Sequence, residues 1–168
     1  MLQRLRLLLS SYPIFLFLAP LFFVYHGYNE LFAQLPISFV LTQAVIIQVA
    51  ALLLFVILRA VIQKPRAAAV ATLLVSVFML MFGFIHDQLK SSSLPHFVSR
   101  YAFLLPLCGI LFIALVVAFR RSVPINWQNH YLFLNVLLLI LIITEIPASF
   151  AAYRQYRETG NLLDARFS

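Results

Sequence analysis

The chain has 168 residues, of which 64% are hydrophobic and only 10% are charged, and its mean hydropathy is +1.01. So few polar side chains cannot cover an apolar core in water, which excludes a soluble globular domain and makes a lipid bilayer the solvent. The formal net charge of +7 does not indicate nucleic-acid binding, because the basic residues stand at the ends of apolar runs, where anionic headgroups and the positive-inside bias account for them.

Five apolar runs are long enough to cross about 30 Å of hydrocarbon, since an α-helix rises about 1.5 Å per residue. The sequence therefore predicts an all-α fold, a polytopic membrane protein with five transmembrane helices in a bundle over residues 1–153, and a polar tail or linker over 154–168. The expected spans are about 7–25, 37–62, 67–85, 101–119 and 131–153.

The first run follows Arg4 and Arg6 and has no small-residue cleavage site at its end, so we expect a retained anchor rather than a cleaved signal peptide. Pro13 is tolerable near the start of this helix, whereas Pro20 falls inside it and should kink it. The kink precedes a compact polar end, residues 26–30, which it would help to aim.

The next two runs supply polar and small side chains at membrane depth. Gln43 and Gln48 lie in the second run, where their amides need partners on other helices. The third run begins with small residues that let a neighbouring backbone approach closely, namely Ala67, Ala68, Ala69 and Ala71. No internal repeat or heptad pattern stands out.

The polar end of the third run resembles that of the first. His26 and Glu30 share a helix face if the helix continues through Gly27, and His86 with Asp87 could join them. Such a set could bind a metal, but no strong ligand spacing is present, so we expect no metal and no other cofactor. The open alternatives are ordinary interfacial side chains and a pocket for a lipid headgroup.

Glu145 lies inside the last run, where a carboxyl group needs a partner, a proton or a cavity. We expect Arg100 and His86 to be its partners, unless Pro147 already ends the membrane part. Arg100 beside Tyr101 could also bind a phosphate group. The candidate outer-leaflet pocket comprises His26, Tyr28, Asn29, Glu30, Gln43, His86, Asp87, Arg100, Tyr101 and Glu145.

An odd number of crossings places the two termini on opposite sides of the membrane. The excess of Lys and Arg favours a cytoplasmic N-terminus and an extracytoplasmic tail in a bacterial inner membrane. The chain contains no Gly-x-Ser-x-Gly motif, no phosphate-binding glycine loop and no zincin pair, so we expect no catalytic residues in it.

Several segments together resemble the N-terminal membrane region of bacterial sulfatase-like hydrolases and transferases, relatives of phosphoethanolamine transferases and lipoteichoic acid synthases. They are Pro20–Glu30, Phe82–Asp87, Arg100–Pro106 and Asn135–Glu145. The resemblance implies a five-span anchor that presents a lipid or headgroup to an extracytoplasmic, metal-dependent catalytic domain. Such a domain would begin near Ser168, so the nucleophile and metal ligands of that family have no counterpart here.

We therefore expect a membrane anchor whose partners are membrane lipids and, outside the membrane, either a C-terminal catalytic domain or a partner protein. We expect no nucleic-acid partner. Two alternatives remain. The chain could be a standalone small membrane protein that assembles with other subunits, or a membrane subunit that carries haem or an ion.

Overall fold

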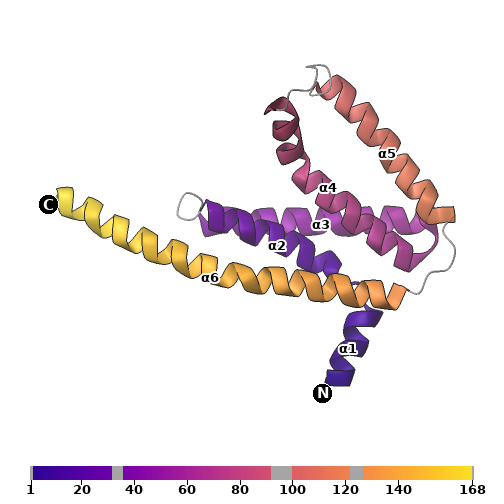
Figure 1. Cartoon of the computed structure of the whole chain (residues 1–168), viewed down its shortest axis with the longest axis horizontal. Helices are drawn as coiled ribbons and strands as arrows, with labels where there is room; N and C mark the ends of the chain where they lie inside the picture. Colours follow the sequence, from indigo (N-terminus) through magenta and orange to yellow (C-terminus); the bar gives the residue numbers. More distant parts are fainter. Residues whose placement is uncertain (1, 32–35, 92–99, 122–126, 168) are drawn as a thin grey trace. The chain divides into compact units, whose positions relative to one another are not determined.

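The structure is a computed structural model that describes residues 2–31, 36–91, 100–121 and 127–167, and its regular secondary structure is entirely helical over these residues (Figure 1). The helices are α1 (Leu2–Ser11), α2 (Phe15–Glu30), α3 (Ile37–Ile62), α4 (Pro65–Ser91), α5 (Tyr101–Arg121) and α6 (Trp127–Phe167). The prediction of an all-α fold is confirmed.

Four helices in the described part of the chain are long and apolar enough to cross a membrane: α3, α4, α5 and the Trp127–Ala151 part of α6. The protein thus has the architecture of a multi-pass membrane protein. The expectation of five such helices was wrong, because the run at 7–25 is not one continuous helix.

Pro13 causes this difference. Proline has no backbone N–H and its ring clashes with the preceding turn, so the helix stops at Ser11 and starts again at Phe15. The second piece, α2, has 16 residues and is about 24 Å long, which is less than the thickness of the hydrocarbon core. Pro20, which we expected to lie inside a helix and to kink it, does lie inside α2.

Other helix ends also differ from the expected spans. Helix α3 covers the expected residues 37–62, but α4 continues past residue 85 to Ser91, so His86 and Asp87 are helical rather than part of a loop. Helix α6 runs through Pro147 and onward to Phe167, over the segment expected to be a polar tail or the start of a linker. Pro147 therefore does not end the helix.

The turn between α3 and α4 contains one residue in a left-handed conformation and one proline. Gln63 adopts a left-handed conformation, with φ of 60°, directly after the last residue of α3. A left-handed residue at this position is a common way to end a helix. Pro65 is the first residue of α4, where its missing N–H costs no intrahelical hydrogen bond.

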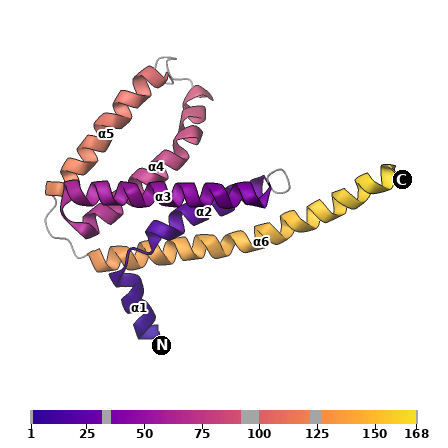
Figure 2. The same ribbon diagram turned by 180° about the vertical axis from the view of Figure 1, so that it is seen from behind.

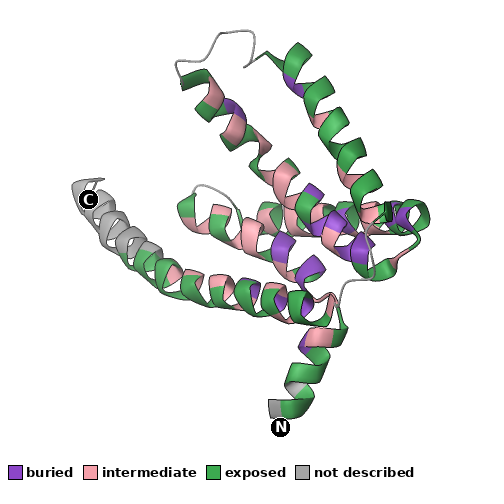
Figure 3. Ribbon diagram, turned by 45° about the vertical axis from the view of Figure 1, so that its right-hand side comes forward, coloured by how far each residue is buried: buried purple, intermediate pink, exposed green. Residues whose placement is uncertain are grey.

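The chain divides into two compact units, which are described separately. The first unit contains residues 1–50 and 128–168, and the second contains residues 51–127. In the first unit α2 lies beside α6 in both opposite views (Figures 1 and 2). Buried residues in this unit gather on the first half of α2 and at the start of α6 (Figure 3).

The core of the second unit forms where the start of α4 packs against the end of α3. Ala67, Ala68 and Ala71 have no exposed surface, and Leu58 and Ile62 are 1% exposed. Small side chains allow this close approach of two helices. The alanine-rich face of α4 is therefore already covered by the chain itself.

Candidate functional site

Helices α2 and α6 are held together along two stripes of residues with the same spacing. On α2 the stripe is Phe15, Ala19, Phe22, His26 and Asn29, and on α6 it is Tyr131, Asn135, Leu138, Ile142, Glu145 and Ser149. Alternating steps of three and four residues keep side chains on one face of a helix. The stripes meet in parallel, since Phe15 contacts Asn135 near one end and Asn29 contacts Glu145 and Ser149 near the other.

Asn135 occupies the point where the first predicted span is broken. Its amide nitrogen donates to the carbonyl oxygens of Leu9, at 2.7 Å, and Tyr12, at 2.9 Å, and its Oδ1 accepts from the backbone N–H of Phe15 at 2.6 Å. In a continuous helix the carbonyl of Leu9 would accept from residue 13, which is proline and has no N–H. One buried side chain thus provides partners for the backbone groups that the break leaves open.

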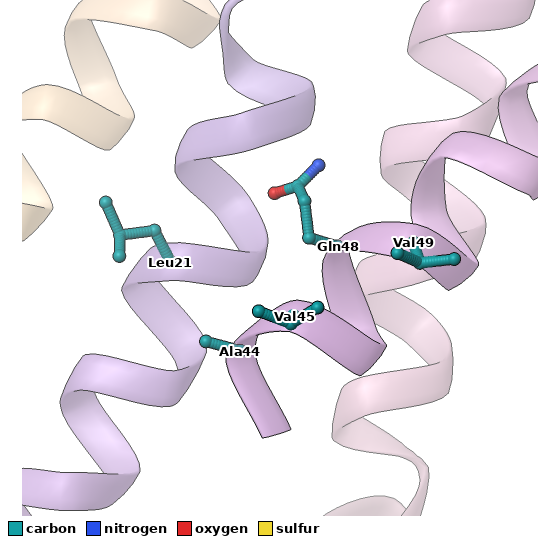
Figure 4. Close-up of a pocket in the computed structure, with 5 residues that line it drawn as sticks. All are labelled: Leu21, Ala44, Val45, Gln48 and Val49. Carbon is teal, nitrogen blue, oxygen red and sulfur yellow. The ribbon is translucent and has the colours of Figure 1, made fainter. Parts of the chain in front are cut away.

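Gln48 of α3 has the same role at the second proline of this region. Pro20 cannot donate to the carbonyl of Leu16 four residues earlier, and the Gln48 amide donates to this oxygen at 3.4 Å. Figure 4 shows the amide between α2 and α3, above a groove that Leu21, Ala44, Val45 and Val49 also line. The expectation that Gln48 finds a partner on another helix is confirmed.

The candidate site itself lies at the far end of the stripes, around Glu145. One carboxylate oxygen of Glu145 is 2.8 Å from Nδ1 of His26, and the other accepts a 2.8 Å hydrogen bond from the amide of Asn29. Ser149 donates to Oδ1 of Asn29 and also hydrogen-bonds the Tyr25 hydroxyl. We name Tyr25, His26, Asn29, Glu30, Glu145 and Ser149 the α2–α6 polar cluster.

The polar cluster has an enclosed side and an open side. The Glu145 side chain is 14% exposed, whereas those of His26 and Glu30 are 46% and 69% exposed. His26 connects the two carboxylates, because its Nε2 lies 3.5 Å from the Glu30 carboxylate. Glu145 therefore holds the imidazole in place, and Glu30 is the carboxylate that a ligand can reach.

One expectation about this cluster differs from the structure, and one open question is answered by it. The sequence predicted Arg100 and His86 as partners of Glu145, but its hydrogen bonds in the structure go to His26 and Asn29. Gly27 made continuation of the helix doubtful, yet α2 continues to Glu30, so His26 and Glu30 do share a face. An apolar environment lets a helix continue through glycine because the backbone hydrogen bonds have no water to exchange with.

The second unit contains the other predicted polar end. The His86 ring stacks on that of Tyr101, with 4.5 Å between the ring centroids, and is 4% exposed. Its Nδ1 lies 3.5 Å from the exposed Asp87 carboxylate. Among the described residues, His86 Nε2 is the buried side-chain nitrogen that has no hydrogen-bond partner.

The remaining predicted residues are located by their helix and their exposure. Arg100 is exposed directly before α5, while Tyr28 and Gln43 are half-buried on α2 and α3. The predicted residues fall into two units, with His26, Tyr28, Asn29, Glu30, Gln43 and Glu145 in the first and His86, Asp87, Arg100 and Tyr101 in the second. That both sets form one pocket stays a prediction.

Sequence reasoning missed Tyr25, Asn135 and Ser149. A signal for the last two was present, because Asn135, Glu145 and Ser149 fall on one stripe of an otherwise apolar run. In the described part of the chain no three His, Cys, Asp or Glu side chains are grouped so that they could hold a metal ion.

Comparisons with known proteins gave no match to a protein-family model, to a curated protein or to a solved structure.

Proposed function

We propose that the chain is a membrane anchor whose α2–α6 polar cluster holds the ammonium end of a zwitterionic lipid headgroup, such as that of phosphatidylethanolamine. The observation that supports this most directly is the exposed Glu30 carboxylate, which lies beside His26 at the end of an otherwise apolar helix pair. The cluster contains two carboxylates and one imidazole but no Lys or Arg, so it attracts a cationic group.

The geometry also supports a division of roles within the cluster. Asn29 donates a hydrogen bond to the Glu145 carboxylate, and the other oxygen of this carboxylate holds the His26 ring. Glu145 and Asn29 are therefore positioning residues. A primary ammonium has three donors and can bind the Glu30 carboxylate and a ring nitrogen together. A trimethylated headgroup has no such donor, so the site should prefer ethanolamine to choline.

We further propose, from the resemblance described above, that this anchor serves a sulfatase-like hydrolase or transferase domain outside the membrane, as part of a longer protein or of a partner. In that arrangement the cluster faces the outer leaflet and presents a lipid-linked substrate or product. Reading the gene beyond codon 168 tests this part directly. A downstream sulfatase-like domain is the expected result, and a stop codon with no such domain encoded nearby contradicts it.

The headgroup proposal is tested by lipid retention. The purified protein, reconstituted in nanodiscs with an equal mixture of phosphatidylethanolamine and phosphatidylcholine, should retain the ethanolamine lipid preferentially in native mass spectrometry. Glu30→Gln should reduce that preference roughly threefold to tenfold, because it removes one charge-assisted contact at a partly exposed site. The matched control is Asp87→Asn, which removes an exposed carboxylate from α4.

An unchanged preference in Glu30→Gln, or an equal loss in both variants, would contradict the proposal. Glu145→Gln adds a test of the division of roles. It keeps a hydrogen-bonding group opposite His26, so it should weaken retention less than Glu30→Gln while lowering thermal stability more.

The two alternatives receive less support. Assembly through the alanine face of α4 is weakened because Ala67, Ala68 and Ala71 already pack inside the second unit. Haem ligation by His26 is weakened because each of its ring nitrogens faces a carboxylate, at 2.8 Å and 3.5 Å. Absence of a Soret band in the purified protein would argue against haem independently.

A further inference from the structure

A second polar recess lies in the first unit, at the opposite end of the α2–α6 pair from Glu145. It forms between α1 and the first turns of α6, and its volume is about 350 Å³. Its lining is Gln3, Arg6, Leu7, Ser10, Gln128, Asn129 and Leu132. Small-ligand sites have volumes of about 300–1,000 Å³, so the recess is large enough for one lipid headgroup.

The charge and chemistry of the lining select the kind of ligand. Among the described residues that form this lining, Arg6 is the one charged side chain, and none carries a carboxylate. A guanidinium binds phosphate oxygens through a fork of donors, while the amides of Gln3 and Asn129 can bind hydroxyl groups. The recess therefore differs in sign from the acidic α2–α6 polar cluster, and it favours an anionic ligand.

The surroundings of the recess are those of a membrane surface. It lies at the start of the apolar Trp127–Ala151 segment of α6. On α1, exposed Leu7 and Leu8 stand beside exposed Arg4 and Arg6, a composition typical of helices that lie in the headgroup layer. Leu7 and Leu132 add an apolar part to the lining, where the first carbons of an acyl chain can pack.

We propose that this recess binds the headgroup of an anionic phospholipid, with the phosphate on Arg6 and the headgroup hydroxyls of a lipid such as phosphatidylglycerol on the amides. This site is independent of the proposed function, since it uses other residues and a ligand of the opposite charge. The bound lipid would hold α1 at the membrane surface and so stabilise the helix break that precedes α2.

The chain itself provides a control for this proposal. Arg4 and Arg6 are both exposed on α1, but Arg6 lines the recess and Arg4 does not. Short-chain phosphatidylglycerol is titrated into the detergent-purified protein and the apparent Kd is measured. Arg6→Gln should raise the Kd about tenfold, because a charged hydrogen-bonding partner is lost, and Arg4→Gln should change it much less. Equal effects would indicate general attraction to a basic surface and would overturn the proposal.

Two further measurements test the shape of the recess and the nature of its ligand. Ser10→Leu narrows the recess without changing its charge, so it should also weaken binding, and unchanged binding in this variant would contradict the site. Should Arg6→Gln not fold, Asn129→Ala tests the α6 side of the recess in the same way. Inorganic phosphate added as a competitor should not displace the lipid; displacement would assign the recess to a soluble phosphate compound and overturn the lipid proposal.

Discussion

Asn135 shows how much one buried amide can determine in an apolar environment. It hydrogen-bonds the carbonyls of Leu9 and Tyr12 and the N–H of Phe15, so a single side chain from α6 closes the break between α1 and α2. Because the Asn135 side chain is fully buried, no water is available to replace these partners. The break therefore depends on a residue more than a hundred positions away in the sequence.

Replacing Asn135 by Leu should destabilise the protein by about 2 kcal/mol or more, because the Leu9 carbonyl and the Phe15 N–H lose the hydrogen bonds that Asn135 makes to them, and the Tyr12 carbonyl keeps only its bond from the N–H of Ile14. The measurement is thermal denaturation in detergent, followed by circular dichroism. Thr144→Leu is the control, since Thr144 is exposed on the same helix and bonds only the carbonyl of Leu141. Equal midpoints for the two variants would show that the break is stable without Asn135.

At the scale of helices, two prolines each leave a backbone carbonyl without its intrahelical donor, and a side chain from a neighbouring helix donates to each. Pro13 leaves the carbonyl of Leu9 without an intrahelical donor, and Pro20 does the same to Leu16. Asn135 of α6 serves the first and Gln48 of α3 serves the second. The region of α1 and α2 is thus hydrogen-bonded to α6 at the Pro13 break and to α3 at Pro20.

A double-mutant cycle between Pro20 and Gln48 tests this coupling. Gln48→Leu alone should cost about 0.5–1.5 kcal/mol, less than Asn135→Leu, because one hydrogen bond of 3.4 Å is lost. In a Pro20→Ala background the backbone N–H of the introduced alanine can donate to Leu16, so the cost of Gln48→Leu should nearly vanish. Thermal midpoints of the four proteins give the coupling energy, and additive effects would refute it.

At the scale of the whole molecule, the four apolar helices α3 to α6 predict an even number of membrane crossings after α2. The connection between α2 and α3 and the tail after residue 153 should then lie on the same side of the membrane. Lys and Arg residues favour the outer side for both, because seven of the twelve are assigned to the opposite side, namely Arg4, Arg6, Arg59, Lys64, Arg66, Arg120 and Arg121.

Alkaline phosphatase fused after Leu31 or after Tyr153 should accordingly be active in both fusions. Folding of this reporter requires an oxidising compartment, so activity reports an extracytoplasmic position. A fusion after Lys64 serves as the negative control. Opposite activities for the Leu31 and Tyr153 fusions would contradict four crossings, and two silent but well-expressed fusions would invert the orientation.

The sequence was sufficient to predict the parts of the fold that depend on local chemistry. Runs of apolar residues specify α3 to α6 because a membrane admits few other structures. The effect of Pro13 was not predictable in the same way, since a proline can kink or break a helix depending on what binds the freed carbonyl of Leu9, and here that partner is Asn135.

The candidate site shows the same limit. His26, Asn29, Glu30 and Glu145 were all selected from the sequence because polar groups at membrane depth need partners. Which groups pair is decided by the register of α2 against α6, which no local pattern contains. Glu145 was therefore assigned to Arg100 and His86, whereas the stripe through Tyr131, Asn135 and Ser149 brings it to His26.

The hydrogen bonds to the Leu9 and Leu16 carbonyls form at different times during synthesis, because their donors lie on helices that are made at different times. A growing chain emerges from its N-terminus, so the segment with both prolines reaches the bilayer before either amide that serves it. Gln48 follows in α3, but Asn135 comes only with α6. Until α6 arrives, the Leu9 carbonyl at the Pro13 break has no hydrogen bond from Asn135, so this interaction does not yet fix the geometry of the break. Helix α6 therefore has to insert before the backbone at the α1–α2 break has all of its hydrogen bonds.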